Sequence, residues 1–371
     1  MKHKLSTFLL VLLIFLLLGG IGLFGYVIYT DLQEPQSNQI TGEDGDSVAI
    51  ESSKNETSKI ANNISQIFTT DKKEELTYSS ETSSGKYFYE QLDDTEKSIY
   101  NGLQENKNNL ATGNYVIQYG SQFSDILKQE NGGTILGNKY QAAIDAFTAD
   151  NPDLFYIEVS KLYINIETSK KAFSTSYNVY IGPEDGKNYY SESFTNEAQV
   201  REAIEQVEKI KNIVVGKMTN SQYKNIKIIH DYIVDTSKYD ENYESKNTYT
   251  IYGALIEHKC VCEGYAKSLK YIANAVGIPC EIIKGTATNS TGVTEKHAWN
   301  CINLNNKWYY MDVTWDDPIV VSSENGESLS TTSYKYFLKG AKNFQNDHIS
   351  ENTFSTNGKE FTYPEMSQTD Y

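Results

Sequence analysis

One stretch, residues 259–280, constrains the fold of this chain more than any other: KCVCEGYAKSLKYIANAVGIPC. Its small and apolar residues recur at helical spacing, which predicts an α-helix that begins at Cys262 and ends near Gly277. A thiol in the first turn of a helix lies near unpaired N–H groups and the positive end of the helix dipole, and both favour the nucleophilic thiolate. Gly264 is costly inside a helix, which indicates that another backbone or a substrate approaches closely there.

The segments after this helix fit strands. Residues 281–285, 297–304 and 307–314 are predicted to be extended, and Asn305-Asn306 is a hairpin turn signal between the last two. The order helix, strand, strand, strand predicts an α+β fold, in which an antiparallel sheet packs against the cysteine-bearing helix.

The N-terminal part contains a long apolar run, residues 5–29, without a charged residue. Its length suffices to cross a bilayer, so a transmembrane anchor is expected within residues 1–30. Lys2 and Lys4 precede the run, and the positive-inside rule then places the rest of the chain outside the cytoplasm. A cleaved signal peptide, which would make the protein secreted, is the alternative.

Three further regions follow the apolar run. Residues 31–85 are rich in polar residues, which predicts a flexible spacer. Residues 86–215 show several helical patterns and one hairpin pattern, which predicts an extension of mixed helix and strand. Residues 216–371 contain the cysteine-bearing helix and the predicted sheet, and one more strand is expected at residues 334–338.

The charge of the chain bears on its partners. The 371 residues carry a net charge of −16 and a single arginine, Arg201. Nucleic-acid recognition rests on neutralisation of phosphates by Lys and Arg, so this composition argues against nucleic acid as a partner.

The four cysteines allow two interpretations. In an oxidising compartment they would usually form two disulfides, and a Cys280–Cys301 bridge between neighbouring strands is one alternative. A bridge between Cys260 and Cys262, which are one residue apart, would be strained. We therefore expect four free thiols, of which Cys262 is the reactive one.

A cysteine nucleophile needs a base within hydrogen-bond reach and a group that orients this base. His297 opens one predicted strand, and Asp312 lies in the next, beyond the Asn305-Asn306 turn. Adjacent antiparallel strands place these two residues nearly opposite each other, with a slip of about two residues that a bulge or a diagonal contact absorbs. Cys262, His297 and Asp312 are therefore predicted to form a catalytic triad.

The motifs around these residues carry a family resemblance. VCEGYAK, GIPC, HAWN and KWYYMDVTWDDP, within residues 226–318, resemble the bacterial transglutaminase-like superfamily, whose papain-like core carries a Cys-His-Asp triad in this order. The resemblance implies that Cys262 is the nucleophile, His297 the base and Asp312 the orienting acid.

The resemblance also implies a reaction, which is acyl transfer on a carboxamide or peptide carbonyl through a thioester at Cys262. An amine or water then resolves the thioester. The backbone N–H of Cys262 is expected to bind the oxyanion, with Tyr252 as the second donor. No calcium-loop pattern of the kind that animal transglutaminases use is present in the sequence, so no metal or other cofactor is expected.

Aromatic and acidic residues flank the predicted triad. Trp299 and Trp315 are expected to pack in the core, with a role as substrate-binding walls that keep water from the thioester as the alternative. Asp316 and Asp317 are expected to form a turn, so Asp312 is preferred as the triad acid.

The remaining histidines receive no catalytic role. His230 lies on an apolar helix stripe and is expected to be a hydrogen-bonded core histidine. His258 and His348 fall in predicted loops.

The sequence thus predicts an enzyme that acts on a protein or peptide substrate at the cell surface or the cell wall, tethered to the membrane by its N-terminal helix. A cysteine protease or a peptidoglycan amidase with the same triad is the alternative among enzymes. A non-catalytic binding module that keeps the fold is the alternative from another class.

Overall fold

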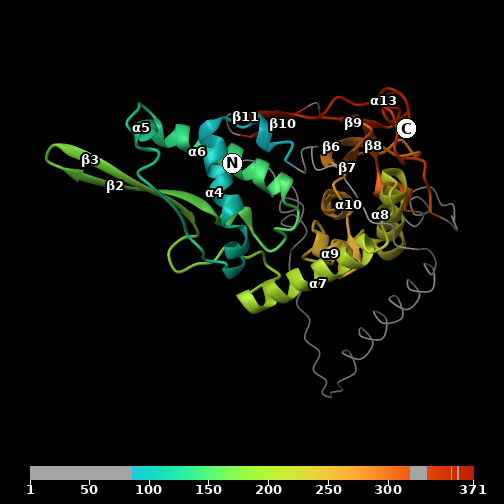
Figure 1. The fold of residues 1–371 in the computed structure, drawn as a ribbon, viewed down its shortest axis with the longest axis horizontal. Helices are drawn as coiled ribbons and strands as arrows, with labels where there is room; N and C mark the ends of the chain where they lie inside the picture. Colours follow the sequence, from blue (N-terminus) through green and yellow to red (C-terminus); the bar gives the residue numbers. More distant parts are fainter. Residues whose placement is uncertain (1–85, 318–331, 352, 357–358) are drawn as a thin grey trace, which may run out of the picture. The chain divides into compact units, whose positions relative to one another are not determined.

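The computed structural model describes residues 86–317, 332–351, 353–356 and 359–371 (Figure 1). The predicted membrane anchor and the predicted spacer lie outside these residues. Within the described part, no helix combines the length and the apolar character that crossing a bilayer requires.

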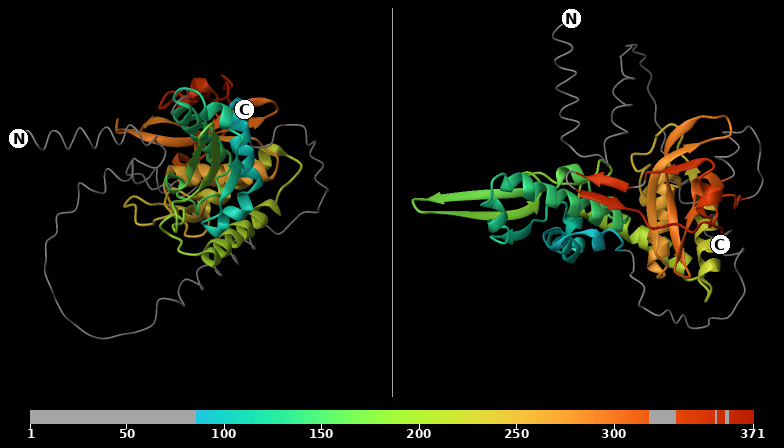
Figure 2. Two further views of the ribbon diagram at one scale, coloured as in Figure 1. Left: turned by 90° about the vertical axis from the view of Figure 1, so that its left-hand side faces the viewer. Right: turned by 90° about the horizontal axis from the view of Figure 1, so that it is seen from above.

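Two long helices, several short ones and one small sheet make up the first described region. In chain order its elements are η1 (Tyr89–Gln91), α4 (Asp94–Glu105), η2 (Lys107–Thr112), β1 (Ile117–Gly120), α5 (Ser124–Leu127), α6 (Gly132–Asp150), η3 (Val159–Lys161), β2 (Tyr163–Lys171), β3 (Ser174–Gly182) and α7 (Glu197–Val215). The sheet has the antiparallel order β1-β3-β2. The predicted hairpin is the pair β2–β3, and it extends beyond α5 (Figures 1 and 2).

The second region contains the predicted cysteine-bearing helix and the larger sheet. Its elements are α8 (Gln222–Thr236), β4 (Lys238–Tyr239), α9 (Ile251–Leu255), β5 (Lys259–Cys260), α10 (Cys262–Ala275), β6 (Cys280–Thr288), β7 (Thr294–Leu304), β8 (Lys307–Met311), α11 (Val313–Asp316), α13 (Ala341–Phe344), β9 (His348–Ser350), β10 (Thr353–Thr356) and β11 (Lys359–Thr362).

The larger sheet has the order β8-β7-β6-β9, and all its neighbours run antiparallel. Helix α10 packs against β6 and β7. Asn305 and Asn306 join β7 to β8 and adopt φ angles of 54° and 61°, as the two central residues of a type I′ turn require. The prediction of a helix packed on an antiparallel sheet, and of this hairpin, is confirmed.

Helix α10 begins at Cys262, as predicted, and the chain leaves it through Gly277, whose φ is 72°. A Cβ at Gly264 would lie 2.5 Å from the Cβ of Cys260 and 3.1 Å from the carbonyl oxygen of Thr248. The close approach that the sequence indicated is therefore made by the chain's own preceding segment. It fixes the first turn of the helix, and with it the thiol, against β5.

The strand predicted at residues 334–338 is wrong, because this segment forms turns and Leu338 adopts a positive φ of 50°. The N–H of Tyr336 donates to the side chain of Asp316 at 2.9 Å, and its carbonyl accepts from the N–H of Asp312 at 3.2 Å. These bonds tie the segment to α11. The later strand in the larger sheet is β9, which pairs with β6.

Two hydrophobic clusters stabilise the described residues. The larger contains buried residues from Phe88 to Phe361, including helices on both sides of residue 215. The smaller gathers around Trp299 and Cys301. Because side chains alternate along a strand, these two residues of β7 face away from Ile302, which belongs to the larger cluster. Both faces of the larger sheet are thus covered.

Candidate active site

The β7–β8 hairpin brings the predicted base and acid together. Leu304 pairs with Lys307 and Asn300 with Met311, so Asp312 lies one residue beyond the end of the ladder and diagonal to His297. Nε2 of His297 is 2.7 Å from Oδ2 of Asp312. The two-residue offset expected from the sequence is bridged by this diagonal contact, so no bulge is needed.

Helix α10 supplies the thiol. Cys262 is its first residue and is half-buried, whereas Cys260, Cys280 and Cys301 are fully buried free thiols. The residue before the helix, Val261, provides no capping side chain. The N–H of Gly264 donates to the carbonyl of Val261 at 2.8 Å, whereas the positive end of the helix dipole at Cys262 has no side-chain cap. The side chain of His297 lies close enough to Cys262 for the two to interact, and this interaction favours the protonated imidazole.

The electrostatics of the three residues favour an ion pair. Burial works against a charged His297, but the ionised Asp312 and the hydrogen bonds to Asp312 and Cys262 outweigh it and raise the pKa of His297 to about 10. Burial alone would raise the pKa of Asp312, but His297 lowers it well below its usual range, and a hydrogen bond from His348 adds to this. The arrangement therefore stabilises imidazolium next to carboxylate, which is the state that supports a thiolate.

The other thiols lie in different surroundings. Burial raises the pKa of Cys260, Cys280 and Cys301 above that of an ordinary thiol, because an apolar interior disfavours the thiolate. The Cys280–Cys301 bridge does not form. The structure thus distinguishes one accessible thiol at a helix N-terminus from three inert ones.

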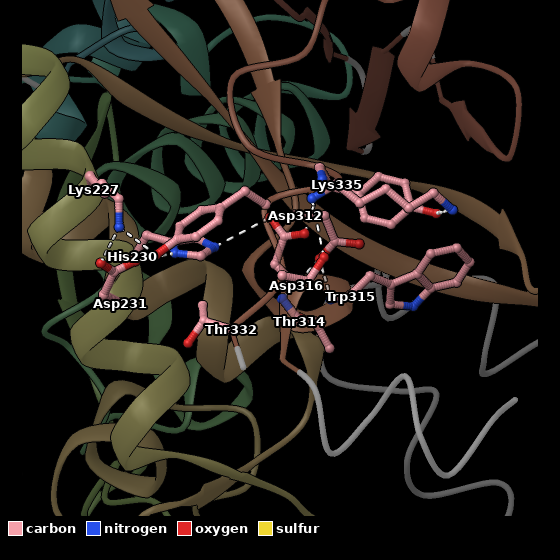
Figure 3. Close-up of polar contacts among 12 residues, drawn as sticks. Lys227, His230, Asp231, Asp312, Thr314, Trp315, Asp316, Thr332 and Lys335 are labelled. Carbon is pink, nitrogen blue, oxygen red and sulfur yellow. Dashed lines mark hydrogen bonds and ion pairs between the residues drawn. The ribbon is translucent and has the colours of Figure 1, made fainter. Parts of the chain in front are cut away.

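Asp312 is also the N-cap of α11. Its Oδ1 accepts from the backbone N–H groups of Thr314 at 3.0 Å and Trp315 at 3.2 Å. At the other end of the helix, Oδ2 of Asp316 lies 3.3 Å from Nε2 of His230, which reaches across from α8 (Figure 3). His230 is fully buried, as expected of a core histidine. The acid is thus held on a short helix that is fixed at both ends.

Of the three aromatic residues expected near the triad, only Trp315 lines a pocket with His297. Trp299 is fully buried in the smaller cluster. Trp315 is half-buried, its ring lies 5.5 Å from that of His297, and both line a small pocket. Tyr252 is not brought to the triad, because its hydroxyl donates to Gln206 at 3.2 Å and its ring stacks on Phe155. The hydroxyl proton of Tyr252 is therefore used in a hydrogen bond to α7.

Two tyrosines near the thiol were not singled out in the sequence. Burial raises the pKa of Tyr243 and of Tyr249, and the negative charge of a Cys262 thiolate raises both further. Their rings lie 6.1 Å apart, and Tyr243 is 59% exposed. Nothing in the sequence distinguishes them among 29 tyrosines.

His348 was also not predicted as a site residue, although it contacts the carboxylate of Asp312 directly. Its Nε2 is 3.0 Å from Oδ2 of Asp312. No role was predicted for His348, because it lies 36 residues after Asp312 and only the pairing of β9 with β6 brings it back. Among the described residues, His297, Asp312 and His348 are the group whose ligand atoms lie close enough together to be weighed as a metal site.

Comparisons with known proteins relate part of this chain to one superfamily. The description "Transglutaminase-like superfamily" belongs to the family model that matches residues 207–313. Kyphoscoliosis peptidase of Mus musculus is 26% identical over 106 residues, which cover 26% of this chain and 16% of that protein. The same protein of Homo sapiens matches with the same values. The chain therefore spans only a small part of these relatives.

Two solved structures are also similar. A crystal structure of a TGase has 16% sequence identity and a TM-score of 0.29, over 48% of this chain and 50% of that one. The periplasmic domain of TgpA from Pseudomonas aeruginosa has 12% identity and a TM-score of 0.25, over 41% of this chain and 56% of that one.

The family match begins within α7, at Val207, and ends just past Asp312, at Val313. It includes the helix that starts with a thiol and the hairpin that joins a histidine to an aspartate. Residues 207–313 are a transglutaminase-like domain.

Proposed function

We propose that this protein transfers acyl groups from protein or peptide amides through a thioester at Cys262. The observation that carries the proposal is the chain of contacts from Asp312 to His297, at 2.7 Å, and from His297 to the thiol. A carboxylate on one imidazole nitrogen leaves the other nitrogen for the thiol, which is the arrangement of a cysteine nucleophile and its base.

The reaction proceeds in two stages. The Cys262 thiolate attacks the amide carbonyl, a C–S bond forms, and the oxyanion is held by N–H groups of the first turn of α10. The C–N bond then breaks, and the leaving ammonia or amine takes its proton from His297. His297 next removes a proton from an incoming amine or water, which attacks the thioester and releases an amide or an acid.

A peptidase with the same residues is the second candidate, and the match to kyphoscoliosis peptidases favours it. The two activities share the first stage and differ in which nucleophile reaches the thioester. Incubation with a glutamine-containing protein and a labelled primary amine separates them. Labelled, cross-linked product supports transfer, whereas new free termini support proteolysis.

The proposed substrates lie outside the cell. This rests on the apolar run at residues 5–29, which is expected to anchor the chain and leave the catalytic region on the outer side. Protease treatment of intact cells tests it, because an outward-facing domain is digested while a cytoplasmic control protein is not.

The decisive experiment measures the rate of alkylation of Cys262 against pH in the full-length chain. Peptide mapping separates Cys262 from the three buried thiols, and the His297→Ala variant is the control. We expect fast labelling well below the ordinary thiol pKa of about 8.5, and its loss in the variant. An ordinary thiol profile that His297→Ala leaves unchanged would refute the proposal and favour a non-catalytic binding module.

A further inference from the structure

A second imidazole shares the oxygen of the triad carboxylate that His297 uses. Oδ2 of Asp312 lies 2.7 Å from Nε2 of His297 and 3.0 Å from Nε2 of His348. His348 is fully buried on β9. The proposed transfer reaction needs only one imidazole on Asp312, so it assigns no role to His348.

The hydrogen bonds of Asp312 show what this second imidazole does. An ionised carboxylate offers about four acceptor positions. Oδ1 accepts from the N–H groups of Thr314 and Trp315, and Oδ2 faces the two imidazoles. All four positions are thus used by the protein, and the carboxylate cannot rotate without losing a donor in a buried site.

His348 is itself fixed from several sides. Its Nδ1 lies 2.7 Å from Oδ1 of Asp347, whose Oδ2 accepts from the hydroxyl of Tyr336 at 2.7 Å. Its ring lies 4.2 Å from that of Phe344 and 4.7 Å from that of Trp315. An ionised carboxylate only accepts, so a proton on Nε2 of His348 makes this nitrogen a donor to Asp312.

A bound metal ion is the other arrangement that these residues could serve. The ligand atoms of His297, Asp312 and His348 lie within 4.8 Å of one another. Zinc bonds of about 2.0–2.1 Å in tetrahedral geometry separate two ligand atoms by roughly 3.3 Å. The oxygen-to-nitrogen separations of 2.7 and 3.0 Å are those of hydrogen bonds. The distances therefore favour direct contact between the side chains.

We propose that His348 is a positioning residue of the triad, which holds the Asp312 carboxylate in the orientation that His297 requires. This rests on the proposed function of Cys262 and His297. Without His348, Oδ2 of Asp312 loses a donor in a site closed to solvent, and the carboxylate turns or takes up a proton. Either change weakens its hold on His297, and the thiolate of Cys262 is less stabilised.

The test compares alkylation of Cys262 against pH in the full-length wild-type chain and in His348→Leu, His348→Gln and Ile349→Thr. The glutamine amide can still donate to Asp312, whereas leucine cannot. Ile349 is the neighbouring β9 residue and is 68% exposed, so its variant controls for damage to the strand.

We expect His348→Leu to slow labelling near pH 6 about ten-fold, the effect of one pKa unit on the thiolate fraction. His348→Gln should recover most of the rate, and Ile349→Thr should match the wild type. Among the described residues, the titratable groups that face His348 are Asp312, Asp347, Tyr336 and, across the shared oxygen, His297.

A wild-type profile in His348→Leu would overturn the inference, as would a His348→Gln variant that is as slow as His348→Leu at equal thermal stability. If His348→Leu does not fold, His348→Gln and Asp347→Asn carry the test. Asp347→Asn removes the charge that anchors Nδ1 and is expected to slow labelling about two- to three-fold; a wild-type rate in Asp347→Asn overturns the inference. An ordinary thiol profile in the wild type refutes the proposed function itself, and the inference with it, whereas a reactive wild type with an unaffected His348→Leu refutes the inference alone.

Discussion

At the scale of single residues, the site depends on where one negative charge is held. Asp312 is fully buried, and it stays ionised because two imidazoles and two backbone N–H groups surround it. That charge in turn keeps His297 protonated. The reactivity of Cys262 is therefore expected to respond to changes at Asp312 more than to changes at nearby acids of similar burial.

The Asp312→Asn substitution keeps the shape of the side chain but removes its charge. The pKa of His297 should fall toward its ordinary value, and the amide N–H₂ would face the wrong nitrogen. We expect labelling of Cys262 near pH 6 to slow by at least ten-fold, as the effect of one pKa unit or more. Asp317→Asn is the matched control, because Asp317 is equally buried but accepts from Tyr265 at 2.8 Å. If Asp317→Asn slows the labelling of Cys262 and Asp312→Asn does not, the triad acid is misassigned.

The raised pKa of His297 also predicts how stability depends on pH. A group whose pKa is raised by folding stabilises the folded state fully below its unfolded pKa, about 6.5 for histidine, and loses this contribution as pH rises through its folded pKa. For His297 that folded pKa is about 10. The free energy of unfolding of the wild type should therefore exceed that of His297→Gln most near pH 6 and least near pH 10. Denaturant unfolding at both pH values measures this difference in the free energy of unfolding. An equal difference at pH 6 and pH 10 would contradict the raised pKa of His297.

Most of the site could be predicted from the sequence because its parts are local. Cys262 follows from a helix start, and His297 and Asp312 follow from the register of one tight hairpin. His348 could not be predicted, because it reaches the site through a pairing of β9 with β6 that no local pattern reveals. Tyr252 was expected to be the second oxyanion donor, but its ring packs on Phe155 and its hydroxyl donates to Gln206.

At the scale of elements, the start of α10 depends on a close contact. The periodicity that predicted this helix is preserved, and its first turn rests on β5 through Gly264. The strand predicted at residues 334–338 is wrong, because the segment forms turns. Its backbone bonds to Asp312 and Asp316, which is a tertiary contact that overrides strand propensity.

The Gly264→Ala substitution tests the contact at the start of α10. The added methyl would lie 2.5 Å from the Cβ of Cys260, so the first turn or β5 must move. We expect a loss of about 1–3 kcal/mol in the free energy of unfolding, together with slower labelling of Cys262. Gly137→Ala in α6 is the matched control, because a Cβ there would meet open space. It should stabilise the protein by up to about 1 kcal/mol. Equal effects of the two variants would show that the contact does not position the thiol.

At the scale of the described molecule, a buried charge cluster joins the first region to helix α10. Lys270 of α10 is fully buried, forms an ion pair with Glu281 of β6 and lies 3.8 Å from Asp150 at the end of α6. Asp150 also accepts from the hydroxyl of Tyr100 at 3.2 Å. Burial raises the pKa of Asp150 to about 7 despite the attraction of Lys270. Two carboxylates thus depend on one ammonium group.

The Lys270→Met substitution would leave both carboxylates in the interior without a cation. Removing one partner of a buried ion pair costs about 3–5 kcal/mol, because the remaining charge is not compensated. Burial already raises the pKa of Glu281 and of Asp150, and loss of the cation raises both further. In the unfolded chain the same groups titrate near pH 4, so the variant loses stability as pH rises above that value. The destabilisation should therefore be larger near pH 8 than near pH 5.

Lys267→Met is the matched control for Lys270→Met, because Lys267 lies on the same helix and pairs with Glu263 at 2.9 Å, but its side chain is 27% exposed. A partly exposed pair contributes about 0–1 kcal/mol. Denaturant unfolding at the two pH values, followed by fluorescence and by circular dichroism, measures both variants. Since the large hydrophobic cluster includes both regions, both probes should report one transition that Lys270→Met shifts as a whole. A Lys270→Met variant no less stable than Lys267→Met near pH 8, or separate transitions for the two probes, would show that α6 and α10 do not fold as one unit.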